Sequence, residues 1–140
     1  MEYEDNIKLR TKFSGPDLCF YEAHEVVEML QSGEVSPTEL IDAALKRVSQ
    51  TGPIINATPT ICEERARISV ASLNKKEWDH PGWLGGLPIT IKDLNNVAGV
   101  RTTYGSRGFA DFIPDKSDLL VERLEARGGI VLGKTNTPEF

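Results

Sequence analysis

Long hydrophobic runs are missing from this sequence. No apolar stretch approaches the roughly 20 residues that a membrane-spanning helix needs. Residues 1–10 are charged and lack the apolar core of a signal peptide. We therefore expect a soluble, cytoplasmic protein with no membrane partner.

Cysteine is scarce as well. The two cysteines, Cys19 and Cys62, lie far apart and show no CxxC spacing. This pattern argues against a disulfide framework and against a zinc site, so we interpret both residues as reduced thiols. His80 has no second histidine, cysteine or acidic residue at ligand spacing and is interpreted as a surface histidine. We expect neither a metal nor a cofactor.

The sequence also lacks an excess of positive charge. Its 16 lysines and arginines are scattered among 21 acidic residues, which gives a net charge of −5. Proteins that bind nucleic acid need a face rich in lysine and arginine, so we expect no nucleic-acid partner. What is present is the composition of a globular domain, with 39% hydrophobic and 26% charged residues in a chain of 140.

Helical patterns fill the first half of the chain. Residues 1–20 are of mixed polarity and are interpreted as an extended N-terminal arm. Apolar residues at helical spacing over residues 23–30 predict a helix that stops at Gly33. Residues 36–39 (SPTE) predict the start of a second helix, because they combine a serine cap, a proline at the first helical position and a glutamate three residues after the cap.

Turn formers and a second capping pattern set the next boundaries. Residues 51–53 (TGP) predict the end of the second helix. Residues 60–63 (TICE) can form another capping box, which predicts a third helix to about Lys76. Trp83, in the aromatic loop that follows, is either a pocket wall or a buried anchor for the loop.

Strand patterns appear in the second half. Residues 87–92 alternate between apolar and polar, which predicts a short strand that ends at Lys92. The following residues, up to Ser106, are rich in glycine, threonine and serine and are predicted to form a loop. Residues 130–132 are a continuous apolar run, typical of a strand covered on both faces. The order of helices and strands predicts an α/β protein with helices packed on a sheet.

Two further patterns flank the last predicted strand. Ser117 is predicted to cap a helix with three inward residues, namely Leu120, Val121 and Leu124. Residues 133–135 (GKT) look like the end of a phosphate-binding loop. However, the apolar strand separates them from Gly128, so we do not expect a nucleotide site.

Three motifs resemble one known family. Residues 86–93 (GLPITIKD), 99–106 (GVRTTYGS) and 132–140 (LGKTNTPEF) resemble, in this order, the opening of the amidase signature family. The segments 36–40 (SPTEL) and 55–57 (INA) are similar to parts of its N-terminal helices, so the likeness covers about residues 20–140. It implies the N-terminal part of a single amidase domain, with helices packed on a mixed central sheet.

The resemblance also implies a chemistry. Members of this family hydrolyse carbon–nitrogen amide bonds to an acid and ammonia or an amine, through a Ser/cis-Ser/Lys triad. Lys92 matches the lysine of that triad. A neutral lysine can act as the base if burial lowers its pKa, and the apolar strand before Lys92 is expected to supply that burial. The implied substrate is a small-molecule amide, and the resemblance assigns no substrate-binding residue within these 140 residues.

Both serines of the family triad lie several tens of residues beyond the lysine, outside this chain. We therefore expect an N-terminal fragment that is inactive in isolation. Ser106 and Ser117 are the local substitutes for a nucleophile, and we accept neither. Ser106 belongs to a segment that in the family lines the site without being the nucleophile, and Ser117 is interpreted as a helix cap.

Other interpretations stand beside this one. Without the resemblance, Lys92 followed by Asp93 at a strand end is typical of a surface ion pair, and Asp93 is expected to order the loop by accepting backbone hydrogen bonds. Thr103 and Ser106 are candidates for orienting the lysine. The alternative functions are the glutamine-hydrolysing subunit of a tRNA-dependent amidotransferase, and a non-catalytic fragment that binds a complementary chain. A homodimer is an option for the full-length form.

Overall fold

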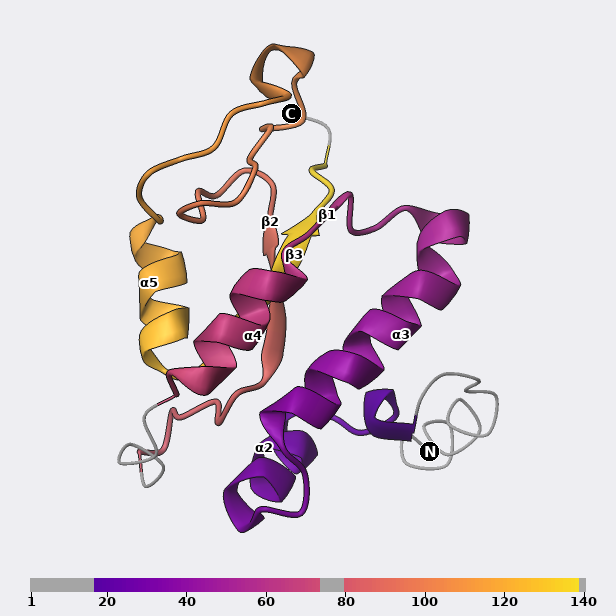
Figure 1. Cartoon of the computed structure of the whole chain (residues 1–140), viewed down its shortest axis with the longest axis vertical. Coiled ribbons are helices and arrows are strands. Elements are labelled where there is room, and N and C mark those ends of the chain that lie inside the picture. Colours follow the sequence, from indigo (N-terminus) through magenta and orange to yellow (C-terminus); the bar gives the residue numbers. More distant parts are fainter. Residues whose placement is uncertain (1–16, 74–79, 139–140) are drawn as a thin grey trace, which may run out of the picture.

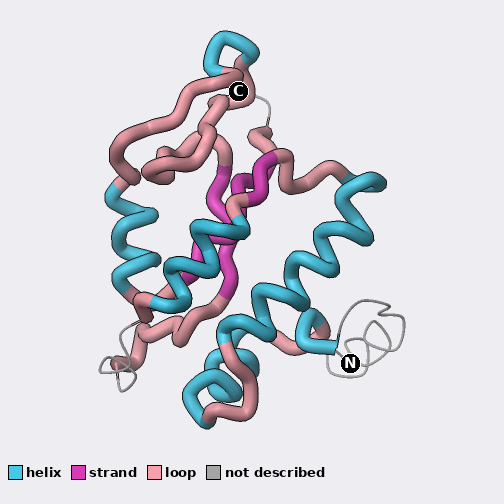
Figure 2. Tube along the Cα trace, in the orientation of Figure 1, coloured by secondary structure: helices cyan, strands magenta, loops and turns pink. Residues whose placement is uncertain are grey.

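Three strands form a small sheet in the computed structural model, which describes residues 17–73 and 80–138 (Figure 1). Helices surround this sheet, and Figure 2 shows how much of the second half is loop. The elements, in chain order, are η1 (Asp17–Cys19), α2 (Ala23–Ser32), α3 (Pro37–Ile55), β1 (Thr60–Ile61), α4 (Glu63–Ala71), β2 (Pro88–Lys92), η3 (Arg107–Phe109), α5 (Leu119–Ala126) and β3 (Ile130–Thr135).

Strand β3 lies in the middle of the sheet, whose order is β1-β3-β2. It runs parallel to β2, with Ile91 opposite Lys134 and Lys92 opposite Thr135, and antiparallel to β1. The predicted α/β class with a mixed sheet is therefore confirmed. All of β3 except Thr135 is buried, as expected for an apolar strand that is covered on both faces.

The start of helix α3 follows its sequence signal. The Ser36 hydroxyl accepts a hydrogen bond from the Glu39 amide at 3.3 Å, and the Glu39 carboxylate accepts one from the Ser36 amide at 2.9 Å. This is a capping box, and it satisfies two backbone donors that no helical partner can reach. Helix α2 ends as predicted at Gly33, whose φ of 78° is accessible to glycine without strain.

The predicted end of α3 at residues 51–53 is wrong. The helix continues through Pro53 to Ile55. A proline removes one backbone donor, but in the last turn this costs the helix a single hydrogen bond. Asn56 then closes the helix in a left-handed conformation, with its amide donating to the Gly52 carbonyl at 2.8 Å.

The second capping box was also predicted wrongly. Residues 60–61 form strand β1, which pairs with β3, and helix α4 begins only at Glu63. The Cys62 amide donates to the Leu132 carbonyl at 2.9 Å, so pairing with a distant strand overrides the local cap signal. Helix α4 ends at Ala71, whereas its predicted end near Lys76 lies outside the described residues.

Helix α5 differs from its prediction in its first turn. It begins after Asp118, not Ser117, and Leu120 is 57% exposed instead of facing inward. Val121 is buried and Leu124 packs against the same cluster, so the other two predicted inward residues are correct. The helix therefore rests on the sheet through one narrow stripe.

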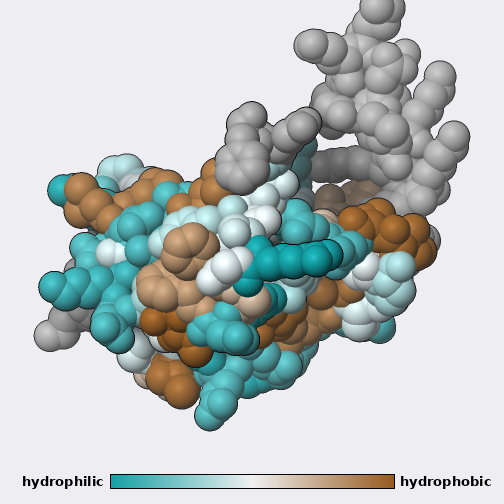
Figure 3. Space-filling model, turned by 90° about the horizontal axis from the view of Figure 1, so that it is seen from above, coloured by the Kyte–Doolittle hydropathy of each residue, from teal (hydrophilic) through white to brown (hydrophobic). Residues whose placement is uncertain are grey.

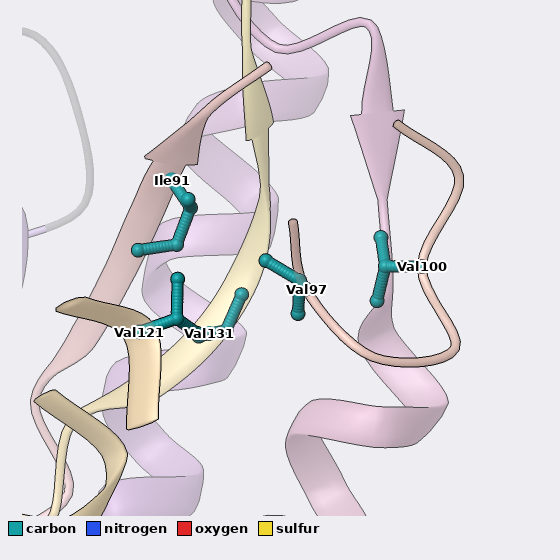
Figure 4. Packing of buried hydrophobic residues seen from close by; sticks show 5 residues of the cluster. All are labelled: Ile91, Val97, Val100, Val121 and Val131. Carbon is teal, nitrogen blue, oxygen red and sulfur yellow. The ribbon is translucent and has the colours of Figure 1, made fainter. Parts of the chain in front are cut away.

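Two hydrophobic clusters lie on opposite faces of the sheet. On one face, α5 and the loop after β2 pack against the strands through Ile91, Val97, Val100, Val121 and Val131 (Figure 4). On the other face, α3 and α4 cover the sheet through Ile41, Ala66, Ile130 and Leu132. Together the two layers bury β3 on both faces, whereas β2 leaves Thr90 and Lys92 exposed on its second face.

Gly133 lies where β1 and β3 approach each other closely. A Cβ atom there would meet the Thr60 carbonyl oxygen at 2.5 Å, a backbone atom that cannot turn aside. We expect Gly133→Ala to destabilise the protein by about 1–3 kcal/mol, the usual cost of overpacking. Gly52→Ala is the matched control, because its Cβ has no neighbour within 4 Å and alanine favours the helix. Thermal denaturation of both variants tests this, and equal stabilities would contradict it.

Some expectations fall on residues that are not described. Of the arm expected over residues 1–20, residues 1–16 lie outside the described part, and Asp17–Cys19 form the short helix η1. Within the described ranges, no helix is both long enough and apolar enough to cross a membrane.

Candidate active site

A buried lysine brings the three motifs together. Lys134 extends from β3, and its side chain is fully buried. Its ammonium donates three hydrogen bonds, to Asp93 Oδ1 at 3.2 Å, to the Asn95 carbonyl at 2.8 Å and to Thr102 Oγ1 at 2.7 Å. Residues 86–93, 99–106 and 132–140, far apart in the sequence, therefore meet at one ammonium group at the end of the sheet.

Asp93 is the counter-ion of this cluster and also a backbone clamp. Its Oδ2 atom accepts one hydrogen bond from the Thr103 amide, at 3.1 Å, and another from the Thr103 hydroxyl. Its own amide donates to the Thr135 carbonyl at 3.0 Å, and its carbonyl accepts from the Tyr104 amide at 3.0 Å. The prediction that Asp93 orders the loop is confirmed. The ion pair with Lys134 was not predicted.

Burial and charge act against each other at Lys134. Removal from water disfavours the ammonium form and lowers the pKa of Lys134, while the hydrogen bond and the charge of Asp93 oppose that shift. The side chain is enclosed on all sides, so no reactant can reach its nitrogen. Lys134 is therefore placed to hold structure together and not to exchange protons with a substrate.

Lys92 is the last residue of β2, and it is exposed. It alternates with Ile91, which is buried in the cluster beneath α5, so the Lys92 side chain leaves the sheet on the opposite face. Within the described part of the chain its ammonium makes no hydrogen bond or ion pair. The surface ion pair with Asp93, which was the alternative interpretation, is absent there, and the expected burial of Lys92 by its own strand is wrong. The cause is the alternation itself, which buries Ile91 and exposes Lys92.

The serines and threonines that the sequence put forward have other partners. The Thr103 hydroxyl donates to Asp93, and Ser106 Oγ accepts the Gly108 amide at 3.2 Å. Ser117 Oγ accepts the Ala98 amide at 2.9 Å, so it holds the loop and does not cap α5, contrary to the prediction. Among the described residues, none of these hydroxyls bonds to Lys92.

A cavity of about 330 Å³ opens beside the Asp93 cluster. Arg101 lines this cavity. Its guanidinium donates hydrogen bonds to Thr60 Oγ1 at 2.9 Å and to the Ala110 carbonyl at 3.2 Å. These bonds connect the loop after β2 to strand β1. Asp93 and Thr103 form part of the same wall. Figure 3 shows the molecule from above, and on this face hydrophobic and hydrophilic residues are interspersed.

Trp83 and His80 take the positions that the sequence suggested. Trp83 is 4% exposed and its ring lies so close to Gly128 that a Cβ there would come within 2.8 Å of it, so it anchors its loop. It also lines a cavity of about 420 Å³, at which Arg65 pairs with Glu125. His80 is exposed, and its Nδ1 accepts the Gly82 amide at 2.9 Å.

Neither a metal site nor a phosphate-binding loop is found in the described ranges. Over residues 17–73 and 80–138, no group of three or more histidine, cysteine, aspartate or glutamate side chains could hold a metal ion. The glycine of the GKT sequence lies within β3, opposite Ile61 and Thr90, and not in a loop before a helix.

Cys62 provides a test of burial near the sheet. Burial raises the pKa of its thiol above the ordinary value of 9.0, and Sγ lies 3.4 Å from the Val131 carbonyl. A raised pKa leaves less thiolate at pH 8, so we expect alkylation by iodoacetamide to be slower in the folded protein than in urea. The rate should rise as the pH passes above 9.0. A Cys19→Ser background isolates the signal, and equal folded and unfolded rates would contradict the expectation.

Comparisons with known proteins agree with the motifs. Residues 39–140 match the family model described as Amidase. An acylamidase of Rhodococcus erythropolis is 38% identical over 125 residues, which are 88% of this chain and 26% of the relative. One subunit of the glutamyl-tRNA(Gln) amidotransferase of a Synechococcus strain is 40% identical over 115 residues, 81% of this chain and 23% of the relative.

Solved structures share the fold. The structure of 6-aminohexanoate cyclic dimer hydrolase complexed with substrate superposes with a TM-score of 0.76 at 31% identity, over 89% of this chain and 25% of that protein. The chain thus spans about a quarter of the length of the relatives that it matches.

Proposed function

Because this chain belongs to the amidase signature family, we propose that it is the N-terminal part of an enzyme that hydrolyses linear amide bonds, with Lys92 as the base of a Ser/cis-Ser/Lys triad. The observation that carries the proposal is the place of Lys92 within the matched region. It ends strand β2 directly after Ile91, which is buried in the cluster beneath α5, and its ammonium has no partner among the described residues. The two serines are proposed to come from chain outside these 140 residues.

The reaction follows from these groups. The neutral Lys92 amine accepts a proton from the bridging serine, which in turn accepts the proton of the nucleophilic serine. The nucleophile attacks the amide carbon, backbone amides stabilise the oxyanion, and the leaving nitrogen takes up a proton as the C–N bond breaks. Water then attacks the acyl-enzyme and releases the acid.

A protonated lysine cannot perform the first step. Lys92 is exposed in this chain, so we propose that the segment carrying the serines also covers it and removes it from water, which disfavours the charged form. Lys134 does not fit the same role. Its nitrogen is enclosed and already donates to three acceptors.

A second candidate is the glutamine-hydrolysing subunit of a tRNA-dependent amidotransferase. It is supported by the 40% identity to the amidotransferase relative from Synechococcus. We favour a free-standing amidase because residues 102–106 (TTYGS) and 85–88 (GGLP) are more similar to that group. The third alternative, a non-catalytic fragment that binds a complementary chain, predicts binding without turnover.

The experiment follows ammonia release from a panel of aliphatic and aryl amides and from glutamine. It compares the 140-residue chain with the same chain supplied with the downstream coding sequence of its gene, either continuous or as a separate chain. We expect hydrolysis only when the downstream sequence is present. Turnover of glutamine alone would favour the amidotransferase alternative, and binding of the downstream chain without any turnover would favour the non-catalytic one.

A further inference from the structure

We propose that Lys134 is a positioning residue for Lys92: its buried ammonium fixes the turn that follows Lys92 and thereby the direction in which the Lys92 side chain leaves the sheet. The inference rests on the proposed function, since it concerns the base of the same reaction. It assigns to Lys134 a role that is separate from proton transfer.

The two lysines lie on adjacent strands. Lys134 lies opposite Ile91 in the parallel ladder, and Lys92 lies opposite Thr135. Residues that are opposite each other share a face, and successive residues of β2 alternate between faces. A register shift opposite Ile89 and Thr90 leaves one extra residue in β3, so Lys134 does not share the face of Leu132. Lys134 therefore shares a face with Ile91, whereas Lys92 points the other way.

Lys134 fixes the backbone that follows Lys92. Before Lys92, Ile91 is buried against Val97 and Val121. After it, Asp93 and the Asn95 carbonyl are both bound by the Lys134 ammonium. A residue whose two neighbours are fixed in this way can change its side-chain rotamer but not the direction of its Cα–Cβ bond.

The cluster around Lys134 also includes residues of the motif at 99–106. Lys134 donates to Thr102 Oγ1, and Asp93 accepts from the amide and hydroxyl of Thr103. The loop that walls the cavity of about 330 Å³ is therefore tied to the same ammonium as the turn after Lys92. Loss of the ammonium would release both together.

Stability alone does not account for such a cluster. Burying a lysine with an aspartate removes both charges from water, and well-packed apolar residues of similar size often stabilise a core as well or better. Apolar residues could not, however, bind the Asn95 carbonyl or hold the Asp93 carboxylate against Thr103. The polar contacts thus specify a geometry that an apolar core would leave free.

The test uses Lys134→Met in the active protein, the chain together with its downstream sequence. Displacement of a catalytic group by about 1 Å can cost on the order of 10²-fold in rate, so we expect kcat to fall by about 10²-fold while KM changes by less than about threefold. Hydrogen exchange of the Thr103 and Tyr104 amides, both of which donate to Asp93, should accelerate in the same variant. A folded Lys134→Met protein with unchanged kcat would overturn the inference.

Thr102→Val is the alternative test variant if the Lys134→Met protein does not fold. It keeps the shape of the side chain and removes one acceptor of the ammonium, and we expect a loss of about tenfold in kcat, again with little change in KM. Ile41→Val is the matched structural control, because Ile41 is fully buried in the cluster on the other face of the sheet. It should leave kcat per folded molecule unchanged. Equal kcat in Thr102→Val and Ile41→Val would overturn the inference.

The outcomes separate this inference from the function on which it rests. Normal wild-type hydrolysis with unaffected Lys134 and Thr102 variants overturns the positioning role only. No hydrolysis by the wild-type protein overturns the proposed function and, with it, the catalytic part of the inference. In that case, faster amide exchange at Thr103 and Tyr104 in the variants would show that Lys134 fixes the turn without a role in catalysis. Unchanged exchange would show that Lys134 does not fix the turn.

Discussion

Replacing Lys92 with alanine is expected to lower kcat for amide hydrolysis by about 10²–10⁴-fold, the usual contribution of a positioned general base. The fold should survive, because the side chain is exposed and makes no hydrogen bond or ion pair within the described residues. The measurement is ammonia release by the variant supplied with the downstream sequence. Circular dichroism and thermal denaturation of the same sample separate a loss of chemistry from a loss of folding.

Lys46→Ala is the control for removing a lysine. Lys46 lies on helix α3, is exposed, and has no assigned role in the reaction. Its variant should keep wild-type kcat and KM. Lys92→Ala with at least half of the wild-type kcat would contradict the assignment of the base.

The second large effect concerns stability. Asp93→Ala leaves the Lys134 ammonium buried without its counter-ion, and we expect it to destabilise the protein by about 3–5 kcal/mol. Thermal and urea denaturation of the variant and the wild-type protein measure the loss. Asp111→Ala is the control, because Asp111 is exposed in the loop after η3, and surface substitutions of this kind usually stay within about 0.5 kcal/mol.

A double-mutant cycle isolates the pair. When Lys134→Met is added to Asp93→Ala, no charge remains buried, so the double variant should be more stable than the sum of the two single losses predicts. The coupling is expected to lie in the range of about 0.5–3 kcal/mol found for residues in one network. Additive losses would show that the 3.2 Å contact between Lys134 Nζ and Asp93 Oδ1 contributes no interaction energy.

Local signals predicted the elements that depend on local contacts. The Ser36 cap, the Gly33 stop and the apolar strand at residues 130–132 were all predicted correctly, because neighbouring residues decide them. The errors lie where contacts with residues far away in the sequence decide the structure. Strand β1 forms because β3 accepts it as a partner, and no pattern within residues 60–63 indicates this.

The site shows the same division. The sequence motif identified Lys92 as the candidate base and Asp93 as a loop-ordering residue. It did not indicate that Lys92 would be exposed, because exposure depends on which face each neighbouring layer covers. It also missed the cluster around Lys134, whose partners lie 32 to 41 residues away in the chain. A lysine directly after the buried residues 130–133 was the one available signal, since a strand buried on both faces must pair any charge that it carries.

The central claim is that this segment supplies the base of an amidase whose nucleophile lies outside it. A serine-reactive fluorophosphonate, followed by peptide mass spectrometry, tests the claim most directly. Applied to the chain with its downstream sequence, it should label one serine beyond residue 140, and Lys92→Ala should slow that labelling. Labelling of Ser106 or of any other serine within the 140 residues, in step with amide hydrolysis by this chain alone, would contradict the account.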